Sequence, residues 1–275
     1  MTPAFIIFTD LDGTLLDHST YSFKAAQPAL NLLRQYKIPL ILVSSKTREE
    51  LRYYRRLTGI ETHPYVVENG SAICNAANLS GGDKKKQTAN DPACMILGKT
   101  YTQIKSTLEE ISAKHHYTIR GFHNATAAEI SDRTGLNSSE TERAMKREFS
   151  VPLFYDQRAE HILRGEIKNY QLNLLFGGRF MHVLGITDKG EAVKIILKHY
   201  REQNPGSAIK SIALGDSRND EAMLRVVDYP VLVRKKDGSH DPAITMPGLI
   251  KSPGIGPQGW NQSVIQLLNK GVGNE

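Results

Sequence analysis

Two aspartates, Asp10 and Asp12, follow a run of four apolar residues near the start of the chain. This run, residues 5–8, predicts a buried parallel strand. Side chains two apart on a strand point the same way, and α/β sheets bind ligands at the carboxyl ends of their strands. We therefore expect both carboxylates in one crevice, where a hard cation such as Mg²⁺ would offset their repulsion. Asp, Gly and Thr are also ordinary turn residues, so this segment alone leaves a structural role open.

Further polar residues occupy comparable positions later in the chain. Hydroxyls and a cation follow the next apolar run, at Ser44, Ser45 and Lys46. Lys189 lies near the start of a later helix, and Asp216 and Asp220 follow the apolar run at 211–214. The additional catalytic or metal-binding candidates are therefore Ser44, Lys189, Asp216 and Asp220. In a parallel sheet these groups can converge with Asp10 at a single edge.

Phosphoryl transfer is the chemistry that this set of groups fits. One carboxylate can attack phosphorus and form an aspartyl-phosphate, and a second can protonate the leaving oxygen and then activate water. A hydroxyl and an ammonium can hold the other phosphate oxygens. A third carboxylate can complete a Mg²⁺ site.

The first third of the chain alternates apolar runs with helical patterns. Helices are expected over residues 25–37 and from Thr47, which has the spacing of a capping box, to Gly59; strands are expected at residues 39–43 and 65–67. This alternation is typical of a doubly wound parallel sheet.

The middle third departs from this alternation. Residues 75–94 are polar and predict a loop or linker. A mixture of helices and short strands follows, with helices expected at 101–116, from Thr126 to Gly135, from Ser139 through Glu148 and at 158–169, and strands at 117–122, 152–155, 171–176 and 179–184. The last two strands flank two glycines and predict a β-hairpin. This third is interpreted as an α+β insert.

The strand and helix alternation resumes at Lys189. Strands are expected at residues 211–214 and 229–233, and an amphipathic segment surrounds Trp260.

Composition narrows the classes of function. The chain has 275 residues, is 40% hydrophobic and 23% charged, and carries a formal charge of +6. Its basic residues are dispersed apart from Lys84–Lys85–Lys86, which is interpreted as a solvated loop, so we expect a small anionic ligand and no nucleic acid. No apolar run reaches the roughly 20 residues of a membrane helix, so no membrane partner is expected.

Cys74 and Cys94 are the only cysteines. They form no disulfide framework or metal cluster pattern, so we expect free thiols. With no signal peptide visible, a cytoplasmic location is the expectation.

The ordered motifs resemble the haloacid dehalogenase superfamily. Asp10-Leu11-Asp12-Gly13-Thr14 resembles its first motif, Ser44 its second, Lys189 its third, and the run from Gly215 to Asp220 its fourth. The resemblance implies a Rossmann-like α/β core with an inserted α+β cap, spanning residues 1–84 and 185–275 for the core and 85–184 for the cap.

The same resemblance implies roles for these residues. Asp10 would be the nucleophile and Asp12 the general acid/base, with Ser44 and Lys189 also catalytic. Mg²⁺ would be held by the Asp10 carboxylate, the Asp12 backbone carbonyl and Asp216. Asp220 would be an occasional metal ligand or lie just outside the metal's ligands.

Two cap segments resemble the mannosyl-3-phosphoglycerate phosphatases. They are Arg147-Glu148-Phe149-Ser150 and residues 177–182, although Val151 and Met181 depart from that pattern. The candidate substrate-binding residues are Ser45, Lys46, Glu68, Asn69, Arg147, Glu148, Ser150, Arg179, His182 and Asn219. The arginines could recognise carboxylate or phosphate, but each could equally be a solvated or structural residue.

The hypothesis from the sequence is thus a Mg²⁺-dependent phosphatase of a small sugar phosphate, acting as a monomer or homodimer. Mannosyl-3-phosphoglycerate is the expected substrate, with glucosyl-3-phosphoglycerate and sucrose phosphate as alternatives. A phosphomannomutase-like phosphotransferase and a non-catalytic sensor are the rivals from other classes, and the intact aspartate pair argues against a sensor.

Overall fold

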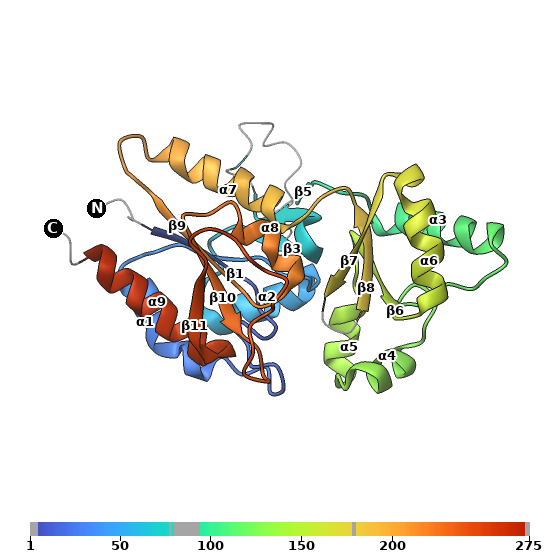
Figure 1. The fold of residues 1–275 in the computed structure, drawn as a ribbon, viewed down its shortest axis with the longest axis horizontal. Helices are drawn as coiled ribbons and strands as arrows, with labels where there is room; N and C mark the ends of the chain where they lie inside the picture. The colour runs from blue at the N-terminus through green and yellow to red at the C-terminus, as the bar shows by residue number, and fades with distance from the viewer. Residues whose placement is uncertain (1–4, 77–78, 80–93, 178–179, 273–275) are drawn as a thin grey trace.

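A parallel sheet of five strands forms the centre of the larger lobe (Figure 1). The computed structural model describes residues 5–76, 79, 94–177 and 180–272. The strand order is β11-β10-β9-β1-β2, and every neighbouring pair is parallel. The strands span β1 Phe5–Thr9, β2 Leu40–Leu42, β9 Lys210–Gly215, β10 Tyr229–Arg234 and β11 Ile250–Ile255. The prediction of a doubly wound sheet is confirmed.

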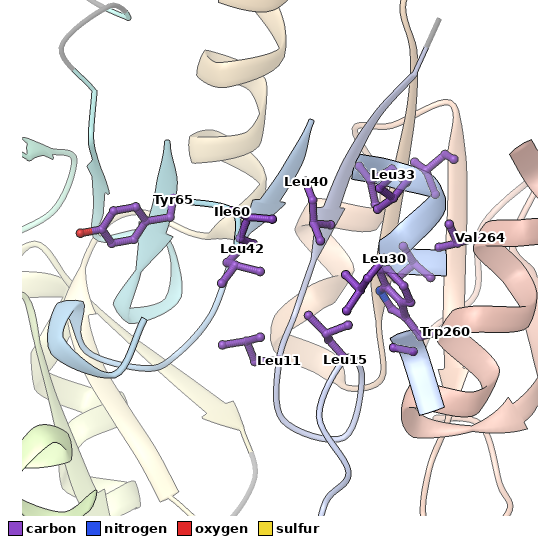
Figure 2. Packing of buried hydrophobic residues seen from close by; sticks show 14 of the residues in the cluster. Leu11, Leu15, Leu30, Leu33, Leu40, Leu42, Ile60, Tyr65, Trp260 and Val264 are labelled. Carbon is purple, nitrogen blue, oxygen red and sulfur yellow. The ribbon is translucent and has the colours of Figure 1, made fainter. Parts of the chain in front are cut away.

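Helices cover both faces of this sheet, and β1 is buried by both layers. The helices α1 (Gln27–Gln35) and α9 (Gly256–Val272) pack on one face with Trp260 at their centre, and α7 (Lys189–Gln203) and α8 (Glu221–Leu224) cover the other (Figures 1 and 2). Alternate residues of β1 therefore enter opposite cores, which explains why its sequence is apolar throughout.

The helix α2 (Arg48–Thr58) follows β2 and begins as the sequence predicts. Thr47 and Glu50 form a capping box, and Gly59 ends the helix in the left-handed conformation at φ +67°. This cap fixes the direction in which the chain leaves Ser44, Ser45 and Lys46.

A small antiparallel sheet lies beyond the edge strand β2. It contains β3 (Tyr65–Val67), β4 (Ala72–Cys74) and β5 (Met95–Ile96) in that order. A single bridge between Val43 and Val66 joins it to the central sheet. The sequence places β3 correctly. The bridge to Val43 is parallel, and the main pairing of β3 is antiparallel, with β4.

The second lobe is built on the antiparallel sheet β6-β8-β7 (Figure 1). Its strands are β6 Ser150–Phe154, β7 Leu172–Gly177 and β8 Phe180–Gly185, and its helices are α3 Tyr101–Lys114, α4 Ala127–Thr134, α5 Ser138–Met145 and α6 Gln157–Glu166. Ile104, Leu163 and Val183 belong to its own buried apolar cluster. The expected β-hairpin is confirmed as the antiparallel pair β7 and β8.

Two local predictions in this lobe are wrong. Residues 117–122 form no strand and make one isolated bridge, from Gly121 to Leu153, where Gly121 packs so closely on the Pro152 carbonyl that a side chain would not fit. The helix α5 is capped by Asn137 rather than Ser139 and ends at Met145, so Arg147 and Glu148 lie beyond it.

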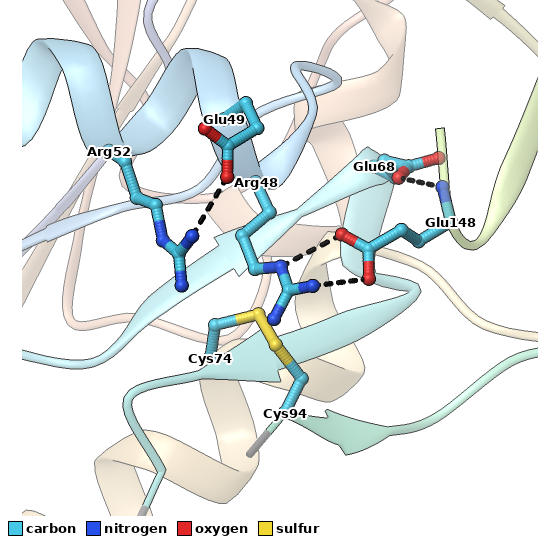
Figure 3. Close-up of a disulfide and its surroundings, with 7 residues drawn as sticks. All are labelled: Arg48, Glu49, Arg52, Glu68, Cys74, Cys94 and Glu148. Atoms are coloured by element: carbon cyan, nitrogen blue, oxygen red, sulfur yellow. Dashed lines mark hydrogen bonds and ion pairs between the residues drawn. A yellow bond between two sulfur atoms is a disulfide. The ribbon is translucent and has the colours of Figure 1, made fainter. Parts of the chain in front are cut away.

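The prediction of two free cysteines is also wrong. Cys74 at the end of β4 and Cys94 just before β5 form a disulfide, with Cα atoms 4.1 Å apart (Figure 3). Antiparallel pairing of β4 with β5 brings the two residues together, and this long-range register is not visible in the sequence. Lys84–Lys86 lies outside the described residues. No helix in the described part of the chain is long and apolar enough to cross a membrane.

Candidate active site

Three buried carboxylates meet at the carboxyl end of the central sheet. Asp10 follows β1, and Asp216 and Asp220 follow β9, the strand beside it. One oxygen of each carboxylate lies within 4.8 Å of the others. The expected convergence of these strand ends is therefore present.

Lys189 lies among these carboxylates and is fully buried. Its Nζ donates to Asp10 Oδ1 at 2.7 Å and to Asp220 Oδ1 at 2.6 Å. Burial by itself lowers the pKa of Lys189, but the two carboxylates outweigh burial and raise it above its ordinary value. Lys189 therefore remains an ammonium that holds Asp10 in place.

The carboxylates are not fully compensated by this one cation. Burial raises the pKa of Asp10 well above its ordinary value, and Asp220 and Asp216 raise it further against the opposing effect of Lys189. Burial, and then the charge of Asp220, raise the pKa of Asp216 to about 7. A positive φ at Gly13 brings its backbone against Asp216, where a Cβ atom would lie 2.9 Å from Oδ2.

Asp220 organises the loop that carries Asp216. Its Oδ2 accepts from the backbone N–H groups of Asp216 at 3.0 Å and Ser217 at 3.1 Å, while its Oδ1 binds Lys189. Both of its oxygens are thus engaged within the protein.

Asp12 points toward a different cation. Its Oδ2 lies 3.0 Å from the Nζ of Lys46, which also lies 3.4 Å from Glu50. Burial lowers the pKa of Lys46, but Asp12 and Glu50 reverse this effect and raise it. The Asp12 side chain remains 39% exposed, so it can reach a ligand in the cavity above.

Ser44 and Ser45 differ in their surroundings. Ser44 is fully buried, and its Oγ accepts from the Lys46 N–H at 3.3 Å. Ser45 lines the cavity. Ser44 therefore shapes this loop from beneath, and Ser45 and Lys46 face the ligand space.

A cavity of about 700 Å³ lies above these groups, between the two lobes. Both lobes contribute to its walls. Its lining residues are Asp10, Asp12, Gly13, His18, Tyr21, Ser45, Lys46, Glu50, Phe122, Thr134, Leu136, Ala144, Arg147, Phe180, His182, Asp216, Ser217, Asn219, Lys235, Lys236 and Asp237. This volume is sufficient for a substrate of two linked small units.

Arg147 and His182 are the cap candidates that line the cavity. The Nη1 of Arg147 donates to the backbone carbonyl of Ser45 at 2.7 Å, so this guanidinium bridges the lobes. Arg179 lies outside the described residues.

The other acidic and hydroxyl candidates of the cap bind partners between the lobes instead of lining the cavity. Glu148 makes a two-pronged pair with Arg48 of α2, at 2.8 and 2.7 Å (Figure 3). Ser150 donates to buried Glu68 at 2.6 Å. Burial raises the pKa of Glu68, while Arg147 and the donors from the cap oppose that shift.

Asn69 and Asn219 form a direct contact. Asn219 lines the cavity and donates through Nδ2 to Asn69 Oδ1 at 3.0 Å. Asn69 itself is buried and lies outside the cavity wall.

The family model described as haloacid dehalogenase-like hydrolase matches residues 7–239. The chain belongs to this family. The match includes Asp10, Lys189 and Asp216, so the resemblance inferred from the sequence motifs is confirmed.

Two relatives of this haloacid dehalogenase-like hydrolase are similar over nearly their whole lengths. Both are named glucosyl-3-phosphoglycerate/mannosyl-3-phosphoglycerate phosphatase. The one from Methanococcoides burtonii is 41% identical over 96% of this chain and 97% of its own. The one from Persephonella marina is 38% identical over 96% and 97%, respectively.

A solved structure supports the fold assignment. A haloacid dehalogenase-like hydrolase from Bacteroides thetaiotaomicron superposes with a TM-score of 0.66 over 95% of this chain and 98% of its own, at 14% identity. At this identity the similarity concerns the fold alone.

A divalent metal fits the donor set of this family member. Asp10 and Asp216 offer oxygen ligands, and the pKa values of both carboxyls are raised. Among the described residues, only Lys189 forms an ion pair with the cluster of Asp10, Asp216 and Asp220. Oxygen-only donors suit a hard cation such as Mg²⁺. The structure therefore has the composition of a site for such an ion.

Sequence reasoning missed several residues of the cavity wall. Lys235 and Lys236 follow β10, and a lysine pair after a strand gives no signal beyond that of a solvated loop. Phe122 and Phe180 come from separate cap segments, and their rings meet edge to face with centroids 5.4 Å apart. Their position at the carboxyl end of β10, where α/β sheets bind ligands, is the signal that could have identified these lysines.

Proposed function

We propose that this haloacid dehalogenase-like hydrolase is a phosphatase of sugar-linked 3-phosphoglycerates that acts through an aspartyl-phosphate. The observation that carries the proposal is the position of Asp10, held by Lys189 beside Asp216 at the floor of a cavity that both lobes line. The two relatives named for this activity support the same substrate class.

In the first step an oxygen of Asp10 attacks phosphorus. A bond forms between this oxygen and phosphorus while the bond from phosphorus to the glycerate oxygen breaks. Lys189 orients the attacking carboxylate through Oδ1. Asp12, which reaches the cavity from the same loop, donates a proton to the departing glycerate oxygen.

In the second step water releases the phosphate. Asp12 takes a proton from water, the water oxygen bonds to phosphorus, and the bond to Asp10 breaks. Inorganic phosphate leaves and the Asp10 carboxylate is restored. Lys46 Nζ lies 3.0 Å from Asp12 Oδ2 and positions this side chain at the cavity.

The carboxylates of Asp10 and Asp216, together with the Asp12 backbone carbonyl, would hold Mg²⁺. When bound, the ion neutralises charge on the phosphoryl oxygens. Because Asp220 has both oxygens engaged, we assign it to positioning Lys189 and the Asp216 loop. Ser44 is buried beneath the loop of residues 44–46 and shapes it, and Ser45, which lines the cavity, is the better placed of the two serines to donate to phosphate.

The cavity composition supports a substrate with a sugar and more than one anionic group. Lys46, Arg147 and the two lysines after β10 supply positive charge, and Phe122 and Phe180 supply apolar surface for the face of a sugar ring. We propose mannosyl-3-phosphoglycerate and glucosyl-3-phosphoglycerate as the substrates to compare first.

We further propose that residues 1–84 and 185–275 form the catalytic core and that residues 85–184 form the cap. Glu68 and Arg48 of the core bind residues 148–150, which follow α5, so this segment attaches the cap to the core. A cytoplasmic location and a monomer or homodimer remain predictions.

Phosphate release with Mg²⁺ is the experiment that tests this function. The panel contains mannosyl-3-phosphoglycerate, glucosyl-3-phosphoglycerate, sucrose 6-phosphate, mannose 6-phosphate and p-nitrophenyl phosphate. We expect kcat/KM to be at least about a hundredfold higher for the sugar phosphoglycerates than for p-nitrophenyl phosphate, because only they reach the cap wall. Equal activity on all five would contradict the substrate class, and isomerised mannose phosphates without release would indicate a mutase.

The Asp10→Asn variant tests the nucleophile. We expect kcat to fall by at least about a thousandfold, because an amide cannot form the acyl-phosphate. The exposed Asp132→Asn change in α4 is the matched control and should leave kcat unchanged. Full turnover by Asp10→Asn, with a normal thermal unfolding curve, would remove Asp10 from this role.

A further inference from the structure

Glu68 is a fully buried carboxylate that binds consecutive residues of the other lobe. Its Oε1 accepts from the Glu148 N–H at 2.8 Å, and its Oε2 accepts from the Phe149 N–H at 3.2 Å and from Ser150 Oγ at 2.6 Å. Figure 3 shows Glu68 directed at the backbone of Glu148. Three donors converging on one carboxylate form a strong charge-assisted contact.

This contact lies beside Arg147 and helps to determine where it lies. Arg147 immediately precedes the bound residues, and its Nη1 lies 4.0 Å from Glu68 Oε2. The same Nη1 donates to the Ser45 carbonyl at 2.7 Å, and the side chain lines the cavity. Within the cap, the end of α5 holds Arg147 from one side, because the Arg147 N–H donates to the Met145 carbonyl at 2.8 Å and its Nε donates to the Ala144 carbonyl at 3.1 Å. The contact with Glu68 fixes the chain on the other side, at Glu148 and Phe149.

Glu68 is itself held rigidly by the core. Glu68 and Asn69 both adopt left-handed conformations, at φ +48° and +60°, which non-glycine residues adopt only when their surroundings impose them. The Asn69 N–H donates to the Ser44 carbonyl at 2.9 Å. Gly70 packs so tightly on Asp188 that a Cβ atom would lie 2.0 Å from its carbonyl oxygen. This loop is therefore a fixed support rather than a mobile contact.

We propose that Glu68 is a positioning residue that sets Arg147 in the cavity for the part of the substrate distant from the transferred phosphate. This inference rests on the proposed function, because it gives Arg147 a substrate group to bind. It differs from the role expected from the sequence, in which Glu68 itself binds the substrate. Here Glu68 never meets the ligand and acts through the cap segment.

Glu68→Gln tests the proposal, because the amide NH2 must face either the Glu148 N–H or the Phe149 N–H, and neither can accept a hydrogen bond. We expect KM for the sugar phosphoglycerate preferred by the wild type to rise at least tenfold. Values of kcat/KM for p-nitrophenyl phosphate should change less than about threefold, because this small substrate offers Arg147 no second anionic group to bind. The matched control is Glu166→Gln, which alters a buried carboxylate bound to Lys114 and His115 elsewhere in the cap.

A double-mutant cycle separates positioning from a general structural role. Arg147→Ala should reproduce the KM increase, and Glu68→Gln combined with Arg147→Ala should be no worse than Arg147→Ala alone. Additive effects, or an equal loss for both substrates, would overturn the proposal.

Ser150→Ala provides a milder test if Glu68→Gln fails to fold. It removes one of the three donors and should raise KM for the sugar phosphoglycerate severalfold with p-nitrophenyl phosphate unaffected; an unchanged KM would overturn the proposal. If the wild type hydrolyses p-nitrophenyl phosphate but no sugar phosphoglycerate, the proposed function fails before these variants are compared.

Discussion

The cations of the cavity differ in how far the protein already neutralises them. Lys46 pairs with Asp12 and Glu50, and Lys235 lies 2.8 Å from Asp241. Arg147 donates to a backbone carbonyl. Among the described residues, Lys236 forms no ion pair within 4.0 Å, although it lines the same cavity and is exposed. Lys236 is thus the cation most available to a ligand.

We predict that Lys236→Ala weakens binding of a substrate that carries a carboxylate as well as a phosphate. KM for the sugar phosphoglycerate should rise roughly five- to tenfold with kcat nearly unchanged, because an ion pair at an exposed rim stabilises the bound substrate and the transition state equally. Steady-state kinetics on this substrate and on mannose 6-phosphate measure the effect.

The exposed Lys251→Ala change in β11 is the matched control for net charge. It should leave both KM values unaltered. If Lys236→Ala raises KM equally for mannose 6-phosphate, the lysine senses the phosphate or the overall field and not a second anion.

The residues of the floor were predictable because chain topology alone brings them together. Asp10 and Asp216 follow adjacent parallel strands, and Lys189 opens the helix that precedes one of them. By contrast, the pairing of Arg48 with Glu148 and of Glu68 with Ser150 depends on how two lobes meet. Residue type could suggest a sugar contact there, but only the three-dimensional packing shows that these groups bind one another.

At the scale of elements, the regular patterns were predicted well and the irregular ones were not. The helix α2 carried both a capping box and a glycine stop. The strand β11 contains Pro253 and Gly254, which disfavour a strand, yet it pairs with β10 at the edge of the sheet. The contacts of β11 with its neighbour outweigh this local preference.

The disulfide joins the end of β4 to the residue just before β5, the strand that precedes α3 of the cap. Disulfides persist mainly in oxidising compartments and in intracellular proteins of hyperthermophiles, so the cysteines that suggested a reducing location no longer support it. Because Cys74 and Cys94 are 20 residues apart, closing this loop reduces the entropy of the unfolded chain.

We predict that Cys74→Ser lowers the free energy of unfolding by about 3 kcal/mol, with a smaller effect if the unfolded chain keeps residual structure. Urea unfolding with and without a reductant measures it. The wild type in reductant should approach the variant, and the variant should be insensitive to the reductant. Identical unfolding midpoints for all four samples would mean that the cross-link does not constrain the unfolded chain.

At the scale of the whole molecule, the central sheet stabilises the core with its faces and holds the charged candidate site at its carboxyl edge. Its faces bury the two apolar clusters that stabilise the core, and its carboxyl edge gathers charges that oppose burial. The cap contributes its own apolar cluster and lines one wall of the cavity. Stability and chemistry therefore reside in different parts of the same elements.

We predict that the charge of buried Asp216 lowers the free energy of unfolding. The pKa of Asp216 is raised to about 7, chiefly by burial and then by Asp220. Since the folded pKa exceeds the unfolded value near 3.8, ionising Asp216 destabilises the metal-free protein increasingly as the pH rises from about 4 to 7. Asp216→Asn should therefore increase the free energy of unfolding by roughly 1–3 kcal/mol at pH 8 in EDTA, and by less at pH 5.

Urea unfolding of the wild type, Asp216→Asn and the exposed Asp132→Asn control at both pH values tests this cost. Mg²⁺ should stabilise the wild type in a concentration-dependent manner and have little effect on Asp216→Asn, because the variant lacks a ligand. A variant that is less stable than the wild type in EDTA, or a gain that is the same at pH 5 and pH 8, would show that hydrogen bonding by Asp216 outweighs its burial. The expected result would instead mean that the residue proposed to hold the metal is retained against the stability of the fold, as befits a functional carboxylate.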